Sequence, residues 1–376
     1  MTQTALRPSP VFPLPEVAEN ITRLIPYIPG KPIEEVEREL GITNIVKLAS
    51  NENSLGPAPK AIAVVQNLAA KMHIYPDAGS NDLRMAVAAH LSVMPENLVF
   101  GNGSDDIIHL LGVTLLSAGD EIIQADPSFV RYAAAGILNN AVCHLVPLTA
   151  DFTHDLDAMA ACINSRTRIV FIANPNNPTA TIVDRDQLQR FLDSIPPAVV
   201  VVMDEAYYEY AAGAPEYPDS LAYVREGRNV VVLRTFSKAY GLAGHRIGFG
   251  VMRPEIAGWL NRAREPFNVN YMAQAAAMAA LGDTEHIDRT IQMNEQGKRQ
   301  MFAAFAELGL TCHPTYGNFV WLDTGRNAKS VYQSLLERGV IVRVSDSFRA
   351  PTYMRVTIGT QQENSRFLEA LREILR

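Results

Sequence analysis

Lys238 stands just after an apolar run that ends near Arg234, in the stretch RTFSKAYGLAGHR of residues 234–246. A lysine at the end of a buried strand is partly desolvated, so its pKa falls and its amine can form a Schiff base with an aldehyde. Thr235, Ser237 and Arg246 add two hydroxyls and a guanidinium, which suit a phosphate group. Taken alone, Lys238 is equally well explained as a surface charge, and its neighbours favour a chemical role.

A carboxylate, Asp204, follows the apolar run AVVVVM of residues 198–203. Burying a carboxylate is costly unless a cation meets it, and a protonated pyridine nitrogen would be such a cation. Tyr207, three residues further on, can bring a phenolic hydroxyl to the same ligand. The alternative role for Asp204 is a magnesium ligand, but the sequence contains no GxxxxGK[ST] loop.

Two polar turns follow other apolar runs. NPNNPT, at 174–179, places Asn177 where it can donate a hydrogen bond to a ring oxygen, although Asn and Pro are also ordinary turn formers. GNGSDD, at 101–106, precedes a helical pattern, and the first N–H groups of a helix suit a phosphate. The alternative is a plain helix cap by Ser104 or Asp105.

Phe129, in DPSFVRY, offers a ring that can stack on a planar cofactor, and a core aromatic is an equally good interpretation on spacing alone. Together these pieces describe a ligand with an aldehyde, a basic ring nitrogen, a ring hydroxyl and a phosphate. The ligand with these four groups is pyridoxal phosphate.

The elements that must position these residues form an α/β pattern. Short apolar runs recur with helical patterns between them, at residues 98–100, 121–125, 168–173, 198–203 and 229–234. Such runs are typical of strands buried on both faces of a mostly parallel sheet. Leu188, Phe191, Leu192 and Ile195 have the spacing of a crossover helix. The predicted fold is α/β, doubly wound or similar, with its ligand site at the carboxyl ends of the strands.

The sequence pattern changes near residue 271. From there, alanine-rich helical patterns are followed by the apolar runs FVWLD, GVIVR and MRVTIG. We therefore predict three parts. Residues 1–45 form an N-terminal arm and part of a small domain, residues 46–270 a large cofactor-binding domain, and residues 271–376 a small α+β C-terminal domain.

Composition narrows the class of protein. The chain has 376 residues and a net charge of -7, which gives no basic field for nucleic acid or an anionic membrane. It contains no apolar run of about 18 residues, and its proline-rich start argues against a secretory signal, so we expect a cytoplasmic protein. Its three cysteines are scattered and its histidines lack metal-site spacing, so we expect no disulfide and no metal.

The motifs also carry a family resemblance. NPNNPT, DEAYY and TFSKAYGLAGHR resemble the signature of the fold-type I, class II pyridoxal-phosphate aminotransferases. SNENSLGP, YPD and PFNVN resemble the histidinol-phosphate aminotransferases among them, over roughly residues 20–375. The resemblance implies a homodimer that interconverts L-histidinol phosphate plus 2-oxoglutarate and imidazole-acetol phosphate plus L-glutamate. The expected partners are therefore small-molecule substrates, with neither nucleic acid nor membrane.

The same resemblance implies a role for each residue around the cofactor ring. Lys238 would bind the cofactor aldehyde, Asp204 the pyridine nitrogen, and Asn177 with Tyr207 the ring oxygen O3′. Phe129 would stack on the ring. In the mechanism implied, Lys238 also moves the proton from the substrate Cα.

The resemblance further implies four phosphate ligands, which are Ser104, Asp105, Ser237 and Arg246. Tyr75 matches a tyrosine that reaches the cofactor phosphate of the neighbouring subunit, which implies shared active sites.

Two positions depart from the family pattern. Ala180 replaces the glycine that usually closes NNPTG, and His245 stands where an apolar residue is common. We expect Ala180 to affect the turn without touching Asn177.

Two arginines point to the substrate. Residues 340–360 predict two strands joined by a loop, and pairing of the strands would bring Arg343 close to Arg355. Like charges held opposite each other are destabilising, and an anion bound between them reverses this. Two exposed, unrelated arginines are the alternative. In the resembled family the matching arginines, with a tyrosine corresponding to Tyr27, bind the substrate phosphate.

Three other functions remain open. An aromatic amino-acid aminotransferase would share every cofactor residue, and relative rates with phenylpyruvate and imidazole-acetol phosphate would separate the two. A lyase resembling threonine-phosphate decarboxylase would release CO2 without 2-oxoglutarate. The effector-binding domain of a transcription regulator ranks last, because no helix-turn-helix or basic module precedes it.

Overall fold

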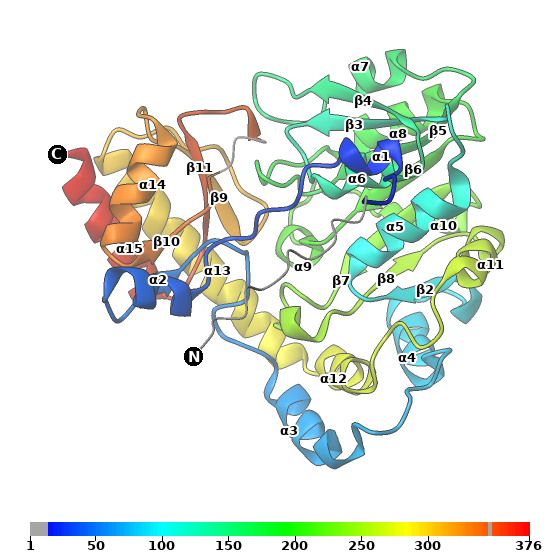
Figure 1. Cartoon of the computed structure of the whole chain (residues 1–376), viewed down its shortest axis with the longest axis horizontal. Coiled ribbons are helices and arrows are strands. Elements are labelled where there is room, and N and C mark those ends of the chain that lie inside the picture. Colours follow the sequence, from blue (N-terminus) through cyan, green and yellow to red (C-terminus); the bar gives the residue numbers. More distant parts are fainter. Residues whose placement is uncertain (1–13, 345–347) are drawn as a thin grey trace, which may run out of the picture.

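The computed structural model describes residues 14–344 and 348–376, which form two packed bodies of unequal size (Figure 1). The larger body is built on a seven-stranded sheet with the order β2-β8-β7-β6-β5-β3-β4. The smaller body contains two two-stranded sheets. Residues 1–13 of the expected N-terminal arm lie outside the described residues.

All strands of the large sheet run in one direction except β8, which is antiparallel to both β2 and β7. The strands are β2 (Leu98–Gly101), β3 (Glu121–Asp126), β4 (Val142–Pro147), β5 (Thr167–Ala173), β6 (Val200–Asp204), β7 (Val230–Thr235) and β8 (Gly248–Val251). The five apolar runs of the sequence form β2, β3, β5, β6 and β7, which confirms the predicted α/β class with its mostly parallel sheet.

Helices cover both faces of this sheet, because successive side chains of a strand point to opposite faces and nearly all of them are apolar. In β6, Val201 and Met203 enter one core cluster, while Val200 and Val202 enter the other. Six helices contribute to the first cluster: α3 (Pro59–Leu68), α4 (Asn81–Leu91), α7 (Leu156–Ala161), α8 (Arg185–Ser194), α10 (Ser220–Arg225) and α12 (Tyr271–Leu281). Three contribute to the second: α5 (Ser104–Leu115), α6 (Arg131–Leu138) and α11 (Pro254–Ala263).

The crossover helix predicted from residues 188–195 is α8. Leu188, Phe191 and Leu192 are buried as its spacing indicates, and Ile195 follows the last residue of the helix. Asp184 caps its first turn and Gln187 bonds back to the Asp184 backbone, so local sequence fixes where α8 starts.

The smaller body packs helices against two short sheets. Its elements are α13 (Thr284–Glu307), β9 (Phe319–Asp323), α14 (Ala328–Glu337), β10 (Val340–Ile341), β11 (Tyr353–Thr357) and α15 (Gln361–Leu375). β11 pairs antiparallel with β9, and β1 (Val46–Lys47) pairs parallel with β10. Val36 of α2 (Ile33–Leu40) packs with Leu336 of α14 and Ile341 of β10. The N-terminal segment thus joins the C-terminal elements.

The remaining described helices are short. They are α1 (Glu19–Thr22), η1 (Ala69–Lys71), η2 (Pro95–Asn97), α9 (Tyr208–Ala211) and η3 (Ala243–His245).

The division of the chain at residue 270 stays a prediction, and the packing of α12 bears on it. Ala273, Ala276, Ala277 and Ala280 of α12 are buried in a core cluster of the large sheet. The long α13 then runs from α12 into the smaller body (Figure 1). This packing favours a boundary after α12.

Candidate active site

A cavity of about 210 Å³ lies at the carboxyl edge of the large sheet, where β5, β6 and β7 end. All the site residues predicted from the sequence line this cavity except Tyr75 and Arg343. Those that do are Tyr27, Ser104, Asp105, Phe129, Asn177, Asp204, Tyr207, Ser237, Lys238, Arg246 and Arg355. Parallel strands deliver their terminal residues to one edge, which explains how positions so far apart in sequence meet.

Lys238 follows β7 and points its amine into the cavity. Its Nζ donates a hydrogen bond to the Ser50 carbonyl oxygen at 3.2 Å and lies 5.6 Å from the centre of the Tyr207 ring. Burial, reinforced by the nearby Arg355 guanidinium, lowers the pKa of Lys238 to about 8. The amine therefore loses its proton readily near neutral pH, as a nucleophile or base requires.

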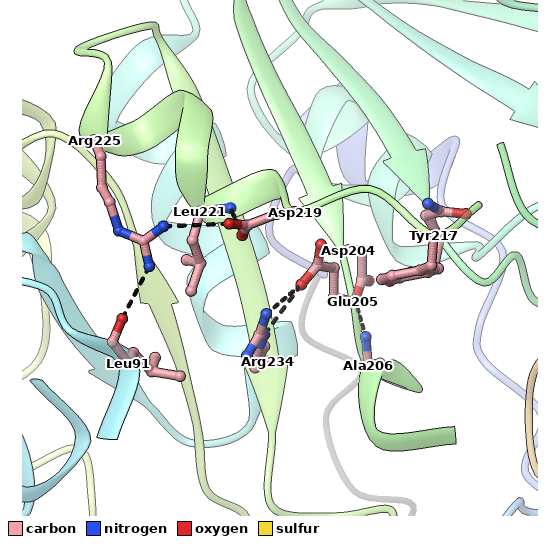
Figure 2. Close-up of polar contacts among 10 residues, drawn as sticks. Leu91, Asp204, Glu205, Ala206, Tyr217, Asp219, Leu221, Arg225 and Arg234 are labelled. Carbon is pink, nitrogen blue, oxygen red and sulfur yellow. Dashed lines mark hydrogen bonds and ion pairs between the residues drawn. The ribbon is translucent and has the colours of Figure 1, made fainter. Parts of the chain in front are cut away.

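Asp204 is the last residue of β6 and is buried. The Tyr132 hydroxyl donates to its Oδ2 at 2.6 Å. The Ala206 N–H donates to its Oδ1 at 3.2 Å (Figure 2). Burial raises the pKa of Asp204 to about 6, and the Tyr132 hydrogen bond opposes that rise. An ionised Asp204 therefore calls for a cation in the cavity.

A buried ion pair holds the ends of β6 and β7 together behind Asp204. Figure 2 shows Arg234 facing Glu205, whose Oε2 accepts from Arg234 Nε at 3.0 Å and Nη2 at 2.9 Å. The guanidinium carbon also lies 3.3 Å from the centre of the Tyr208 ring. Breaking such a pair would leave a buried charge, so it fixes the strand ends that carry Asp204 and Thr235.

The loop before α5 and the turn after β7 form a hollow suited to an anion. Gly103, at φ 85°, precedes Ser104, and a Cβ built on Gly103 would lie 2.6 Å from Arg246 Nη2. Arg246 Nη1 approaches Ser237 Oγ at 3.4 Å. The first residues of α5 leave backbone N–H groups without helical acceptors, so N–H, hydroxyl and guanidinium groups converge there.

Asp105 and Phe129 both line the cavity. The Asp105 carboxylate pairs with Arg131 Nε at 2.7 Å, so its Oδ1 is already engaged and any contact with an anion would come from its backbone N–H. Phe129 meets Tyr132 edge to face, with ring centres 5.6 Å apart. Tyr132 itself stacks on Phe171, which holds its hydroxyl toward Asp204.

Asn177 and Tyr207 are both tied to the smaller body. Arg355 Nη1 donates to Asn177 Oδ1 at 2.6 Å, and Asn51 Nδ2 donates to the Tyr207 hydroxyl at 2.9 Å. Arg355 Nη2 also donates to the Ala49 carbonyl at 2.6 Å. The two residues predicted to bind a ring oxygen are thus held by β11 and by the segment that follows β1.

Arg343 and Arg355 pair as the sequence indicates. They form an antiparallel bridge, with Arg343 N donating to Arg355 O at 3.0 Å and Arg355 N to Arg343 O at 2.8 Å. Burial, with Arg343 nearby, lowers the pKa of Arg355, and its buried Nε has no partner among the described residues. The guanidinium carbon of Arg343 lies 5.5 Å from the centre of the Tyr27 ring, and Tyr27 lines the cavity. Residues 345–347 of the predicted loop lie outside the described residues.

Tyr75 lies away from the cavity and is 78% exposed. It stacks on Phe267, with ring centres 4.7 Å apart. Its exposed ring is available to a second copy of the chain, and its predicted role stays a prediction.

The two departures from the family pattern are both partly or fully buried. Ala180 adopts φ 59° and is buried beside Tyr207, so an alanine occupies a backbone conformation that favours glycine. His245 ends η3, and burial lowers its pKa.

Sequence reasoning missed three residues that line the cavity, Ser50, Asn51 and Tyr132. It also missed Thr357, which hydrogen-bonds to Asn51. Tyr132 lies in the quoted stretch DPSFVRY, and Ser50 and Asn51 lie in SNENSLGP. Their motifs were visible, but the partners of each side chain come from distant strands. Thr357 carried no sequence signal.

Residues 14–344 and 348–376 contain neither a metal-ligand cluster nor a membrane-spanning helix. No group of three or more His, Cys, Asp or Glu side chains in these ranges could hold a metal ion. None of the helices described there has the length and apolar character to cross a membrane.

The fold and this cavity define a class of protein: the chain belongs to the class I and II aminotransferase family, whose sequence model matches residues 43–371. Its relatives include a histidinol-phosphate aminotransferase of Moorella thermoacetica, 51% identical over 97% of this chain and 95% of the relative. Another, histidinol-phosphate aminotransferase 2 of Carboxydothermus hydrogenoformans, is 44% identical over 96% of this chain and 99% of the relative.

A solved structure agrees with these relatives. The histidinol-phosphate aminotransferase of Sinorhizobium meliloti, in complex with pyridoxal-5′-phosphate, superposes with a TM-score of 0.89 at 26% identity. The match covers 97% of this chain and 98% of that one. The fold is therefore that of the fold-type I pyridoxal-phosphate aminotransferases, as predicted.

Proposed function

We propose that this chain is a pyridoxal-phosphate-dependent aminotransferase that interconverts L-histidinol phosphate plus 2-oxoglutarate and imidazole-acetol phosphate plus L-glutamate. The observation that carries the proposal is one cavity lined by the Lys238 amine, the buried Asp204 carboxylate and the hollow between Gly103 and Arg246. The matches to histidinol-phosphate aminotransferases support the substrate.

The residues around the cavity fit the cofactor group by group. Lys238 would hold the cofactor aldehyde. The protonated ring nitrogen of the cofactor would be the cation that the Asp204 carboxylate requires. Asn177 and Tyr207 would hold the ring oxygen, and Phe129 would cover the ring. The phosphate would be held by Ser104, Ser237 and Arg246 and by the backbone N–H of Asp105. Thr235 lies beside them in the cavity lining.

When bound, the cofactor withdraws electrons from the substrate carbon that bears the amine and so makes its proton acidic. Lys238, whose pKa burial lowers to about 8, then takes the proton from that Cα as a general base. The ionised Asp204 favours a protonated ring nitrogen. Tyr132 helps to keep Asp204 ionised, because its hydrogen bond lowers the carboxyl pKa.

The substrate's phosphate would bind beside the arginine pair. Arg343 and Arg355 are held next to each other by their backbones, and Arg355 is buried with Nε unpartnered among the described residues. An anion between them relieves their repulsion and gains charge-assisted hydrogen bonds. Tyr27, which lines the cavity beside Arg343, would complete the site. Glutamate would use the same arginines through its side-chain carboxylate.

The enzyme is further proposed to be a cytoplasmic homodimer in which Tyr75 reaches the cofactor phosphate of the neighbouring subunit. The exposed Tyr75 ring supports the shared site. The three unpaired cysteines support a reducing compartment.

Replacing Lys238 tests the proposal. Wild-type protein purified with pyridoxal phosphate should show a visible absorption band that shifts when histidinol phosphate is added. Lys238→Ala should lose the covalent link to the cofactor, seen by mass spectrometry after borohydride reduction, and its turnover should fall by at least about 10³-fold. The exposed Lys60→Ala serves as the control and should behave as wild type. Normal transamination by Lys238→Ala would refute the proposal.

A further inference from the structure

The Tyr207 hydroxyl sits at the end of a directed chain of hydrogen bonds that begins on β11. The Asn51 N–H donates to Thr357 Oγ1 at 3.0 Å, and Thr357 Oγ1 lies 3.0 Å from Asn51 Oδ1. Asn51 Nδ2 lies 2.9 Å from the Tyr207 hydroxyl oxygen. All three residues are buried.

The direction of each bond follows from the donors available. Because Thr357 Oγ1 accepts from a backbone N–H, its own proton is free to be donated to Asn51 Oδ1. That bond fixes the orientation of the Asn51 amide, so its NH2 group is the end that faces Tyr207. The Tyr207 oxygen therefore accepts from Asn51 and keeps its single proton for another partner.

We propose that Asn51 and Thr357 are positioning residues that hold the Tyr207 hydroxyl as a donor into the cavity, toward the ring oxygen of the cofactor. This inference rests on the proposed function, because the acceptor is the cofactor that the proposed function requires. It assigns a role to two side chains that do not themselves need to touch the reacting atoms.

The backbone conformation of Asn51 suits this positioning role. Asn51 adopts φ 55°, a left-handed conformation that asparagine and glycine tolerate better than other residues. The Asn318 side chain donates to the Asn51 carbonyl at 3.0 Å and so fixes the peptide that follows Asn51. An asparagine thus satisfies the backbone and supplies the amide, which glycine would not do.

The chain also links the cofactor oxygen to the substrate end of the site. Thr357 and Arg355 are two residues apart on β11, so their side chains leave the same face of the strand. Arg355 holds Asn177, while Thr357 acts through Asn51 on Tyr207. One strand therefore positions both residues proposed to bind the ring oxygen.

The charged and titratable groups near Tyr207 are Asp204, Lys238, Arg355, Tyr27, Tyr132 and Tyr210. Burial raises the pKa of Tyr207, while the Arg355 charge and the Asn51 hydrogen bond lower it. The phenol therefore keeps its proton at neutral pH and can donate it as a hydrogen bond.

The test is the pH midpoint of the visible absorption change of the holoenzyme. A hydrogen bond donated to the ring oxygen draws off negative charge that otherwise favours the protonated form of the nearby Lys238 nitrogen. Thr357→Val removes the hydroxyl at nearly constant shape, so the midpoint should rise by about half to one pH unit. Thr357→Ser, which keeps the hydroxyl, should restore the wild-type midpoint.

Two further variants separate positioning from stability. Asn51→Gly keeps the left-handed backbone and removes the amide, so its midpoint should rise in the same direction and its affinity for pyridoxal phosphate should fall. Thr167→Val removes a buried hydroxyl that accepts from Asn164 N at the far end of β5. This control should lose stability in urea without moving the midpoint.

The outcomes are distinct. If Thr357→Val and Asn51→Gly fold but keep the wild-type midpoint, the inference is overturned and the proposed function stands. The same conclusion follows if the midpoint of Thr357→Ser is as high as that of Thr357→Val. Wild-type protein that shows no visible band with pyridoxal phosphate overturns the proposed function, and this inference with it.

Discussion

Two ionisable residues in the cavity have pKa values displaced toward neutrality by the same cause. Burial lowers the pKa of Lys238 to about 8 and raises that of Asp204 to about 6, since a low-dielectric site disfavours either charge. Groups displaced in this way mark functional sites. As a result, more of the Lys238 amine is neutral near neutral pH, and the ionised Asp204 strongly favours a cationic partner.

Tyr132 should tune Asp204. Tyr132→Phe removes the donor 2.6 Å from Asp204 Oδ2, so the pKa of Asp204 should rise above its wild-type value of about 6. The carboxyl then ionises only at higher pH, and the acidic limb of the pH profile of kcat should move upward. Loss of a hydrogen bond to a charged group should lower kcat about tenfold. Tyr316→Phe, which loses a surface bond to Glu216, is the matched control. An unchanged acidic limb would contradict this role.

Lys238 and Asp204 were predictable because each lies within four residues of the end of an apolar run, and strand ends converge in a parallel sheet. Tyr132 and Thr357 were not. Each acts through a hydrogen bond to a residue that lies far away in sequence, and neither side chain is unusual for its own element. Such contacts depend on how the bodies pack, which single-sequence patterns do not contain.

At the scale of elements, a second polar cluster lies at the opposite edge of the large sheet. Glu121, the first residue of β3, is 1% exposed. It accepts from Asn164 Nδ2 at 2.7 Å and Arg166 Nε at 2.7 Å, and lies 2.6 Å from His144 Nε2. These partners tie the beginnings of β3, β4 and β5 together. The hydrogen bond from Asn164, with those from Arg166 and His144, lowers the pKa of Glu121 to about 2.

Glu121→Gln should therefore weaken the fold most at neutral pH. A carboxyl whose folded pKa lies below its unfolded value stabilises above about pH 4.5, and that contribution is lost as pH falls toward 2. Because Arg166 is largely exposed, solvent screens the pair, and we expect a loss of about 1–2 kcal/mol in urea unfolding at pH 7. The gap between variant and wild type should close as the pH is lowered below 4.5. A gap independent of pH would contradict the ion-pair account.

Sequence patterns predicted five strands of the large sheet and missed β4 and β8. β4 is an edge strand with mixed burial, so it lacks the continuous apolar run of its neighbours. β8 has the sequence GFGV, and glycine is a poor strand former, so its place between β2 and β7 comes from pairing on both sides. β4 and β8 therefore form because of their pairing within the sheet rather than because of local residue preference.

At the scale of the whole molecule, the cavity lies between the two bodies. The large sheet supplies Lys238 and Asp204, while β11 and the segment after β1 supply Arg355 and Asn51. The sequence correctly predicted that Arg343 and Arg355, the arginines proposed to bind the substrate, lie side by side in the second body. It did not show that β11 and the segment after β1 also hold the residues proposed to bind the cofactor ring.

Mixing two inactive variants tests the shared site proposed for Tyr75. Lys238→Ala lacks its own lysine, and Tyr75→Ala would lack only the tyrosine lent to its partner. After subunit exchange, half of the dimers should be mixed, and each should contain one intact site. Activity should therefore recover to about one quarter of wild type. In the control, Lys238→Ala is mixed with Tyr316→Phe, which keeps an active site. This mixture gives the baseline activity for subunit exchange. Failure of the Tyr75 mixture to recover would exclude sites shared through this residue.

The most direct measurement is the ratio of kcat/KM for L-histidinol phosphate to that for L-phenylalanine, each with 2-oxoglutarate as acceptor. Two charge-assisted contacts from Arg343 and Arg355 predict a ratio of at least about 100. The ratio should fall at least about tenfold in Arg343→Ala, because one guanidinium is lost. A wild-type ratio at or below about one would contradict the account and would indicate an aromatic amino-acid aminotransferase.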